Sequence, residues 1–264
     1  LARANAELEK IISDMGQELK MAAQIQKILS PTELPNIPGF DFSSKFIAGS
    51  ERGGDYFDIF ELEDKMRFGV VLACSSGYSM SALFLSVLIK LSAQIEAKKG
   101  MSPELVIAKM AQEIVPQIES KDTASIFYGI FDRRTYELRY CSVGSMTGFL
   151  MPYGQDNITR LLPSTKAFAK SYSEKPLSQA VQMNSKDRLI LTTEGVLEAR
   201  NQNGEMFGVD RLAESVLRAP RLGVHDVRNE IIYQTEQFSG LSEPVRDQTV
   251  IVIEVKDKVI KLAK

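Results

Sequence analysis

An apolar repeat fills the first 29 residues of the chain. Apolar side chains recur at alternating steps of four and three residues, interrupted by Asn5 and Gln26, and this is the spacing of a heptad seam. The seam consists of Leu1, Asn5, Leu8, Ile12, Met15, Leu19, Ala22, Gln26 and Leu29. A 3.5-residue period held over about four heptads favours dimerisation through this helix. A single amphipathic helix lying on its own domain is the alternative.

Beyond three prolines at positions 31, 35 and 38, the pattern changes to short runs that are typical of strands. Strands are expected at residues 40–47, 55–61, 66–74, 124–131, 136–142, 147–151, 158–162, 188–193 and 249–255. Helices are expected at residues 79–97, 103–118, 209–218 and 225–238. Strands and helices come in blocks instead of alternating, which predicts an α+β fold with antiparallel sheets covered by helices. We expect two parts, a helical linker over residues 1–30 and a globular domain over residues 31–264.

One stretch combines backbone freedom with carboxylates. Gly53 and Gly54 precede a predicted strand that carries Asp55 and Asp58. A second run, residues 68–77, is apolar for six positions and ends in Ser-Ser-Gly, which predicts a buried strand followed by a tight turn. A carboxylate beside such a turn fits the wall of a metal or phosphate site, and an ordinary hairpin with a solvated Asp is the alternative.

Composition limits the classes of function. The chain has 264 residues, 44% of them hydrophobic, with 32 basic and 34 acidic side chains and a net charge of −2. This balance gives no support for nucleic acid or an anionic membrane as the main partner. Two cysteines and no signal-peptide pattern indicate a cytoplasmic setting. Because the chain begins at Leu1 inside a helical pattern, we expect a piece of a longer sensor protein, whose other part could hold a membrane anchor.

The sequence lacks the residues that several common catalytic and nucleotide-binding sites require. A cysteine phosphatase loop needs Arg six positions after the Cys, but Met80 follows Cys74 and Thr147 follows Cys141 at that distance. Both cysteines are therefore expected to be core residues. The only histidine, His225, lies far from any Ser or Cys motif, which leaves a surface or capping role. No Gly-rich nucleotide-binding motif is present.

The motifs that remain resemble those of the SpoIIE/RsbU-type branch of the PPM metal-dependent serine/threonine phosphatases. The likeness runs from about residue 20 to residue 256. It is carried by MAAQIQKILSP at 21–31, GGDYFD at 53–58, FYGIFD at 127–132, LRY at 138–140, TEGVLEARN at 193–201, FG at 207–208 and RDQT at 246–249. The resemblance implies an αββα sandwich of two antiparallel sheets flanked by helices.

In the family, carboxylates from four motifs hold two Mn²⁺ or Mg²⁺ ions, and a metal-bound water attacks the phosphoester. Carried over by position, Asp55 is kept, Glu194 replaces an Asp, Cys74 replaces the bridging Asp, and Arg246 replaces the fourth Asp. The A-G-H segment of the family reads Val143-Gly144-Ser145 here.

Charge decides between the interpretations. Two carboxylates remain where four would offset two divalent ions, and Arg246 adds a positive charge. A unit charge pair at 4 Å is worth about 4 kcal/mol at an effective dielectric constant near 20, so an Arg would strongly repel a metal. Asp58 and Asp247 are possible substitute ligands, although a residue one step along a strand faces the other side unless a loop intervenes.

The sequence therefore predicts a pseudophosphatase, a dimeric regulatory or binding domain with no cofactor. Leu8, Ile12, Met15, Leu19, Ala22 and Leu29 are its candidate dimerisation residues. By resemblance, its partner is a STAS-type or another signalling protein. The alternative is an active Mn²⁺- or Mg²⁺-dependent phosphatase with a rearranged site, which dephosphorylates a STAS-type anti-sigma factor antagonist.

Overall fold

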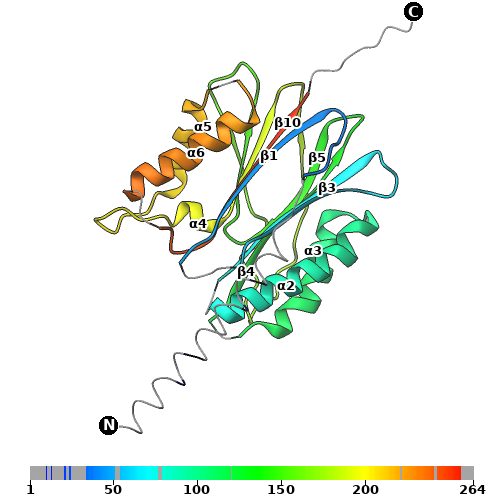
Figure 1. Ribbon diagram of the computed structural model, residues 1–264. Coiled ribbons are helices and arrows are strands. Elements are labelled where there is room, and N and C mark those ends of the chain that lie inside the picture. The colour runs from blue at the N-terminus through cyan, green and yellow to red at the C-terminus, as the bar shows by residue number, and fades with distance from the viewer. Residues whose placement is uncertain are drawn as a thin grey trace, which may run out of the picture.

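The computed structural model describes residues 34–50, 54–76, 79–119, 121–220, 222–240 and 243–256, together with the single residues 10, 13, 21 and 24. The predicted heptad seam, with its candidate dimerisation residues, and the boundary between the two expected parts lie outside these ranges. Within them the fold is two antiparallel sheets packed face to face, with helices on both outer faces (Figure 1). This confirms the predicted αββα sandwich.

The first sheet has the strand order β1-β10-β9-β6-β7. Its strands are β1 (Phe40–Ile47), β10 (Gln248–Val255), β9 (Arg188–Thr192), β6 (Thr147–Met151) and β7 (Thr159–Leu161). Three helices belong to this half of the molecule, namely α4 (Glu194–Leu197), α5 (Gly208–Arg218) and α6 (Val224–Ser239). Val250 and Val252 of β10 pack with Leu212 of α5 and Ile231 of α6 in one buried cluster.

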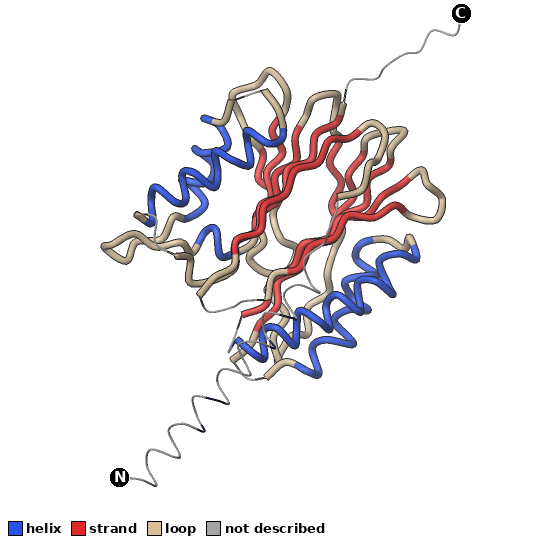
Figure 2. The backbone as a smooth tube through the Cα atoms, in the orientation of Figure 1, coloured by secondary structure: helices blue, strands red, loops and turns tan. Residues whose placement is uncertain are grey.

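The second sheet has the strand order β2-β3-β4-β5-β8. Its strands are β2 (Tyr56–Glu61), β3 (Arg67–Ser76), β4 (Thr123–Asp132), β5 (Glu137–Val143) and β8 (Gln179–Gln182). It is covered by α2 (Ser79–Glu96) and α3 (Pro103–Ile114), each followed by a short 3-10 helix, at Ala97–Lys99 and Val115–Gln117. Figure 2 shows the strands as two layers between the two pairs of long helices.

The interior is built from the period-2 alternation of the strands. Phe57 and Ile59 of β2 face the other sheet, where they join a core with Ile251 and Ile253 of β10. Tyr56, their neighbour, points the other way and packs under α2 and α3. The two faces of one strand thus enter two different cores, which is why β3 and β4 are buried along almost their whole length.

The strands and helices expected between residues 40 and 255 are all present, and strand bounds differ by at most two residues. Within the described ranges, the sequence analysis did not predict β8 and α4. Strand β8 is polar and mostly exposed, so it shows no alternation, and α4 is a single turn. Both cysteines are buried and free, as predicted. His225 lies at the exposed start of α6, where its Nδ1 shares a hydrogen bond of 2.8 Å with Ser43 Oγ, which fits the predicted surface role.

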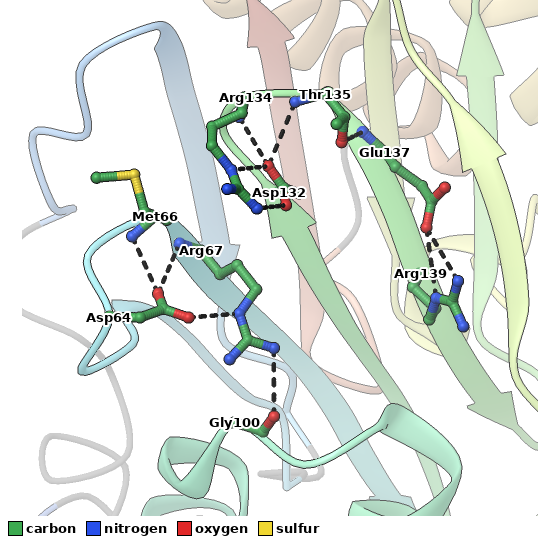
Figure 3. A network of polar contacts seen from close by, with 9 residues as sticks. All are labelled: Asp64, Met66, Arg67, Gly100, Asp132, Arg134, Thr135, Glu137 and Arg139. Atoms are coloured by element: carbon green, nitrogen blue, oxygen red, sulfur yellow. Dashed lines mark hydrogen bonds and ion pairs between the residues drawn. The ribbon is translucent and has the colours of Figure 1, made fainter.

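The hairpins β2–β3 and β4–β5 close through aspartate turns at one end of the sheet (Figure 3). Asp64 Oδ1 accepts the N–H groups of Met66 and Arg67, each at 3.0 Å. Asp132 Oδ1 accepts those of Arg134 at 2.8 Å and Thr135 at 3.3 Å. Such side-chain to backbone bonds explain why an Asp stands at both turns, Asp64 between β2 and β3 and Asp132 at the end of β4. Within the described ranges, no helix combines the length and apolar character that crossing a membrane requires.

Candidate functional site

Polar side chains from both sheets meet at the opposite end of these strands. Five segments contribute to this strand-end site: the start of β2, the end of β3, the start of β4, the junction of β9 with α4, and the approach to β10. The side chains are Asp55, Cys74, Ser125, Thr193, Glu194, Glu198, Arg246, Asp247 and Thr249. The structure therefore brings together four of the positions that the family resemblance selected, Asp55, Cys74, Glu194 and Arg246.

Asp55 joins the two sheets. It lies two residues before Phe57, so strand alternation turns its side chain toward the other sheet. Its Oδ2 accepts hydrogen bonds from Thr193 Oγ1 and Thr249 Oγ1, both at 2.7 Å. Asp55 as a whole residue is 8% exposed. Burial first, and then the nearby Asp247 carboxylate, raise the pKa of Asp55 to about 8, so the group is largely protonated at neutral pH.

Asp247 is buried beside Asp55 but has a partner of its own. Its Oδ1 accepts the backbone N–H of Gly49 at 2.9 Å, which fixes the chain just before β10. The preceding side chain, Arg246, is directed instead to the start of α4. Asp247 still acts on the pKa of Asp55, because it precedes the regular strand and does not follow strict alternation.

Arg246 forms the central ion pair of the site. Its Nη1 lies 3.1 Å from Glu194 Oε2 and 2.6 Å from Glu198 Oε2. The other oxygen of Glu194, Oε1, accepts a 2.6 Å hydrogen bond from Ser125 Oγ. The Glu194 side chain is 13% exposed, and that of Arg246 is 22% exposed. One guanidinium nitrogen thus contacts two carboxylates, that of Glu194 in α4 and that of Glu198, the residue directly after α4.

Cys74 lies among these charged groups as a neutral thiol. Its Sγ donates to Met146 Sδ at 3.7 Å, and the residue is 2% exposed. Burial, followed by the Glu194 and Asp55 carboxylates, raises the pKa of the Cys74 thiol well above its ordinary value. It therefore supplies packing and no negative charge at this position.

Asp58 lies elsewhere. It is on β2 one residue out of phase with Phe57 and Ile59, on the face that carries Tyr56 toward α2. The Tyr56 hydroxyl donates to Asp58 Oδ2 at 3.3 Å. Of the two substitute ligands proposed from the sequence, Asp247 lies close to Asp55, and Asp58 is on the opposite face of its strand.

Four polar residues of the site had no role in the sequence analysis. Thr193, Glu198 and Thr249 lie within the family motifs, so the sequence could have marked them as candidate site residues. Their hydrogen-bond partners, however, are far away in the sequence. Ser125 sits in an apolar strand with no signal at all. Among the described residues, no group of three or more His, Cys, Asp or Glu side chains is arranged to hold a metal ion.

A cleft of about 530 Å³ opens beside the Arg246 ion pair. One wall carries Glu198, Ala199 and Arg246, and the facing wall is the C-terminal half of α6 with Thr235 and Glu236. Solvent therefore reaches Arg246 and Glu198 from this side.

Comparison with known proteins agrees with the strand-end motifs. The family model for stage II sporulation protein E (SpoIIE) matches residues 64–256. The chain belongs to the SpoIIE family. Phosphoserine phosphatase RsbU of Bacillus subtilis (strain 168) is 22% identical over 201 residues, which cover 75% of this chain and 58% of RsbU. Protein IcfG of Synechocystis sp. is 24% identical over 226 residues, 75% of this chain and 35% of IcfG. The chain thus spans only part of these relatives.

Solved structures agree on the fold. The SiaA-PP2C domain of Pseudomonas aeruginosa has a TM-score of 0.75 at 17% identity, over 94% of this chain and 98% of that domain. The PP2C phosphatase domain of SpoIIE from Bacillus subtilis, solved with a fragment of its regulatory domain, has a TM-score of 0.69 at 16% identity, over 85% of this chain and 64% of that structure. The resemblance to the SpoIIE/RsbU type and the predicted fold are confirmed.

Proposed function

We propose that this SpoIIE-family domain is a pseudophosphatase, a regulatory domain of a bacterial signalling protein that acts by binding and not by turnover. The observation that carries this proposal is the ion pair of Arg246 with Glu194 and Glu198. Arg246 stands where the family resemblance puts one metal-binding Asp. Its guanidinium pairs with Glu194, which stands where the resemblance puts a second metal-binding Asp.

The donor set does not fit two divalent ions. Both oxygens of Glu194 already accept from Ser125 and Arg246, and the buried Cys74 thiol stays protonated. Asp55 Oδ2 already accepts hydrogen bonds from two threonine hydroxyls. Hard divalent cations need several ionised oxygen ligands, and a neighbouring guanidinium opposes them. These contacts therefore oppose metal-dependent hydrolysis at the strand-end site.

The partner is inferred from the family only. RsbU is described as a phosphoserine phosphatase, and we propose that this chain binds a STAS-type or other phosphorylated signalling protein without hydrolysing it. The heptad seam of residues 1–29 supports a homodimer that passes a signal to the sandwich. Light scattering before and after deletion of residues 1–29 tests this part, because an unchanged dimer contradicts it.

Calorimetric titration with Mn²⁺, together with phosphopeptide hydrolysis in millimolar Mn²⁺, tests the loss of the metal centre. We expect no Mn²⁺ binding and no hydrolysis by the wild-type chain. Two bound ions per chain and metal-dependent hydrolysis would instead establish the alternative, an active phosphatase with a rearranged site. The double variant C74D/R246D is the matched gain-of-function control, because it restores the two family carboxylates, and we expect Mn²⁺ binding to appear in it.

A further inference from the structure

We propose that the cleft of about 530 Å³ beside Arg246 binds a guanidinium or ammonium group on an aliphatic stem. This group belongs either to an arginine or lysine side chain of a partner protein or to a free amine. The volume lies within the range of roughly 300–1,000 Å³ that is typical of small-ligand clefts. Such binding goes beyond the proposed function, and it does not depend on whether the strand-end site holds metal.

The hydroxyl groups on the wall of α6 already use their protons within the protein. Thr235 Oγ1 donates to the backbone oxygen of Ile231 at 2.8 Å, and Ser239 Oγ donates to the backbone oxygen of Glu236 at 3.2 Å. A hydroxyl whose proton is engaged in this way can still accept a hydrogen bond. A ligand in the cleft therefore meets acceptors at both positions.

Gln248 adds a largely buried acceptor to the same cleft. It is 4% exposed, and it lies on the face of β10 that carries Val250 toward α6. Its Nε2 donates to the backbone oxygen of Gly195 at 3.2 Å, and no described residue donates to its Oε1. An amide oxygen held away from bulk water without a donor favours a ligand that supplies one.

Two unpaired carboxylates and a helix end favour a positive charge in the cleft. Glu236 and Glu243 both line the cleft, and no described side chain pairs with either of them. Glu236 is in the last turn of α6, a helix of 16 residues that has no basic residue in that turn. The partial negative charge at the C-terminus of a helix attracts cations, and this end of α6 lacks a basic side chain of its own.

The two guanidinium groups on the walls do not cancel this negative charge. Arg246 contacts the two carboxylates of Glu194 and Glu198, so these three side chains together are negative. Arg200 donates from Nη1 to the backbone oxygen of Gly204 at 2.7 Å. With Glu194 included, four carboxylates around the cleft oppose two guanidinium groups, which favours a cationic ligand.

The apolar part of the lining fits an aliphatic stem. Ile47, Ala199, Met206 and Val245 line the cleft, and Met206 and Val245 are 46% and 54% exposed. The stem of an arginine or lysine side chain covers apolar surface of this kind while its charged end reaches polar groups. A metal ion would leave this surface uncovered, and an anion would face the carboxylates.

Calorimetric titration of the chain with two probes tests the proposal and separates the two sources of the ligand. The probes are the peptide acetyl-Leu-Arg-Leu-amide and agmatine, a free guanidinium compound with an aliphatic stem. We expect the peptide to bind with a Kd of roughly 0.1 mM, an affinity suited to a short ligand in an open cleft. The neutral peptide acetyl-Leu-Gln-Leu-amide should bind at least about tenfold more weakly, because it offers no charged donor.

The relative affinities of the two probes identify the source. Agmatine that binds as tightly as the Arg peptide assigns the cleft to a free amine. Tighter binding of the peptide assigns it to a side chain of a partner protein.

A matched pair of double variants locates the binding. E236Q/E243Q removes the two unpaired carboxylates, and we expect it to bind the Arg peptide at least about tenfold more weakly. E113Q/E119Q removes two exposed carboxylates from the half of the molecule that carries α3, and it should keep the affinity within about twofold. All four positions are exposed, so the melting temperatures of both variants should match that of the wild type.

Several results would overturn the proposal. Binding of neither probe would do so, as would equal affinity for the Arg and Gln peptides or an unchanged affinity in E236Q/E243Q. An equal loss in both double variants would show that overall charge, and not the cleft, attracts the probes. None of these results bears on the loss of the metal centre, which the Mn²⁺ titration tests separately.

Discussion

The two ends of strands β2, β3 and β4 use the same residue types in opposite ways. At the hairpin end, Asp64 pairs with Arg67, with side chains 39% and 36% exposed (Figure 3). The hydrogen bond from Arg67 lowers the pKa of Asp64. At the strand-end site, Asp55 is buried between the sheets, and its pKa is raised to about 8. Solvent access, and not residue type, decides whether the Asp is charged.

This difference separates local from global causes. Each hairpin aspartate bonds to backbone groups two or three residues away, so the turn can form without the rest of the protein. Asp55 depends on hydroxyls more than a hundred residues away, so its environment exists only after both sheets have packed. Substitutions at the strand-end site should therefore have larger effects than equivalent ones at the hairpins.

The largest expected effect is that of Gly195→Ala. A Cβ on this residue of α4 would lie 2.0 Å from the backbone oxygen of Asp247, which cannot move without disturbing β10. Overpacking against backbone should cost about 3 kcal/mol or more, measured by urea denaturation. Gly223→Ala is the control, because its nearest neighbour would be Asp226 Oδ2 at 3.6 Å, and it should change stability by less than about 1 kcal/mol. Equal effects of the two substitutions would contradict the close approach of α4 to β10.

Asp55→Asn should change how stability depends on pH. The folded pKa of about 8 lies above the ordinary value of 3.8, so the folded state holds a proton that the unfolded state releases. This contribution is complete below about pH 4 and is lost as the pH rises to about 8, at no more than roughly 1.4 kcal/mol per pH unit. Denaturation in urea and EDTA at pH 5 and pH 8 should show a smaller fall for D55N than for the wild type. Identical slopes would refute a buried, protonated Asp55.

Asp64→Asn should change stability by at most about 0.5 kcal/mol, because the pair with Arg67 is exposed and Asn can still accept the turn hydrogen bonds. The lowered pKa of Asp64 acts in the opposite direction to that of Asp55, since its contribution is lost as the pH falls through the folded pKa. D64N should therefore keep the wild-type slope between pH 5 and pH 8. A flattened slope in D64N would mean that the hairpin end, and not Asp55, dominates that range.

The smallest expected effect is on thiol labelling. Burial raises the pKa of Cys141 to about 11 and that of Cys74 well above its ordinary value, so neither offers a reactive thiolate. Folded protein at pH 8 should show no reaction with a disulfide reagent, while urea should expose both thiols. Rapid labelling of Cys74 alone would show that the strand-end site opens to solvent.

The sequence by itself determined the elements and the class of fold. Alternating runs such as residues 56–61 fix which side chains are buried, and the aspartates at 64 and 132 close their turns through local bonds. It also selected Asp55, Cys74, Glu194 and Arg246 as positions that belong together, because motifs record this grouping. The polar strand β8 lacked such a pattern and was missed.

Only the tertiary structure decided what these four residues do. Ser125 and Glu198 became partners of Glu194 and Arg246 through the packing of two sheets, which no local pattern records. The same packing separated Asp58 from Asp247, although both looked like substitute ligands along the chain. Charge, burial and partner are properties of neighbours in space, and the sequence lists neighbours only along the chain.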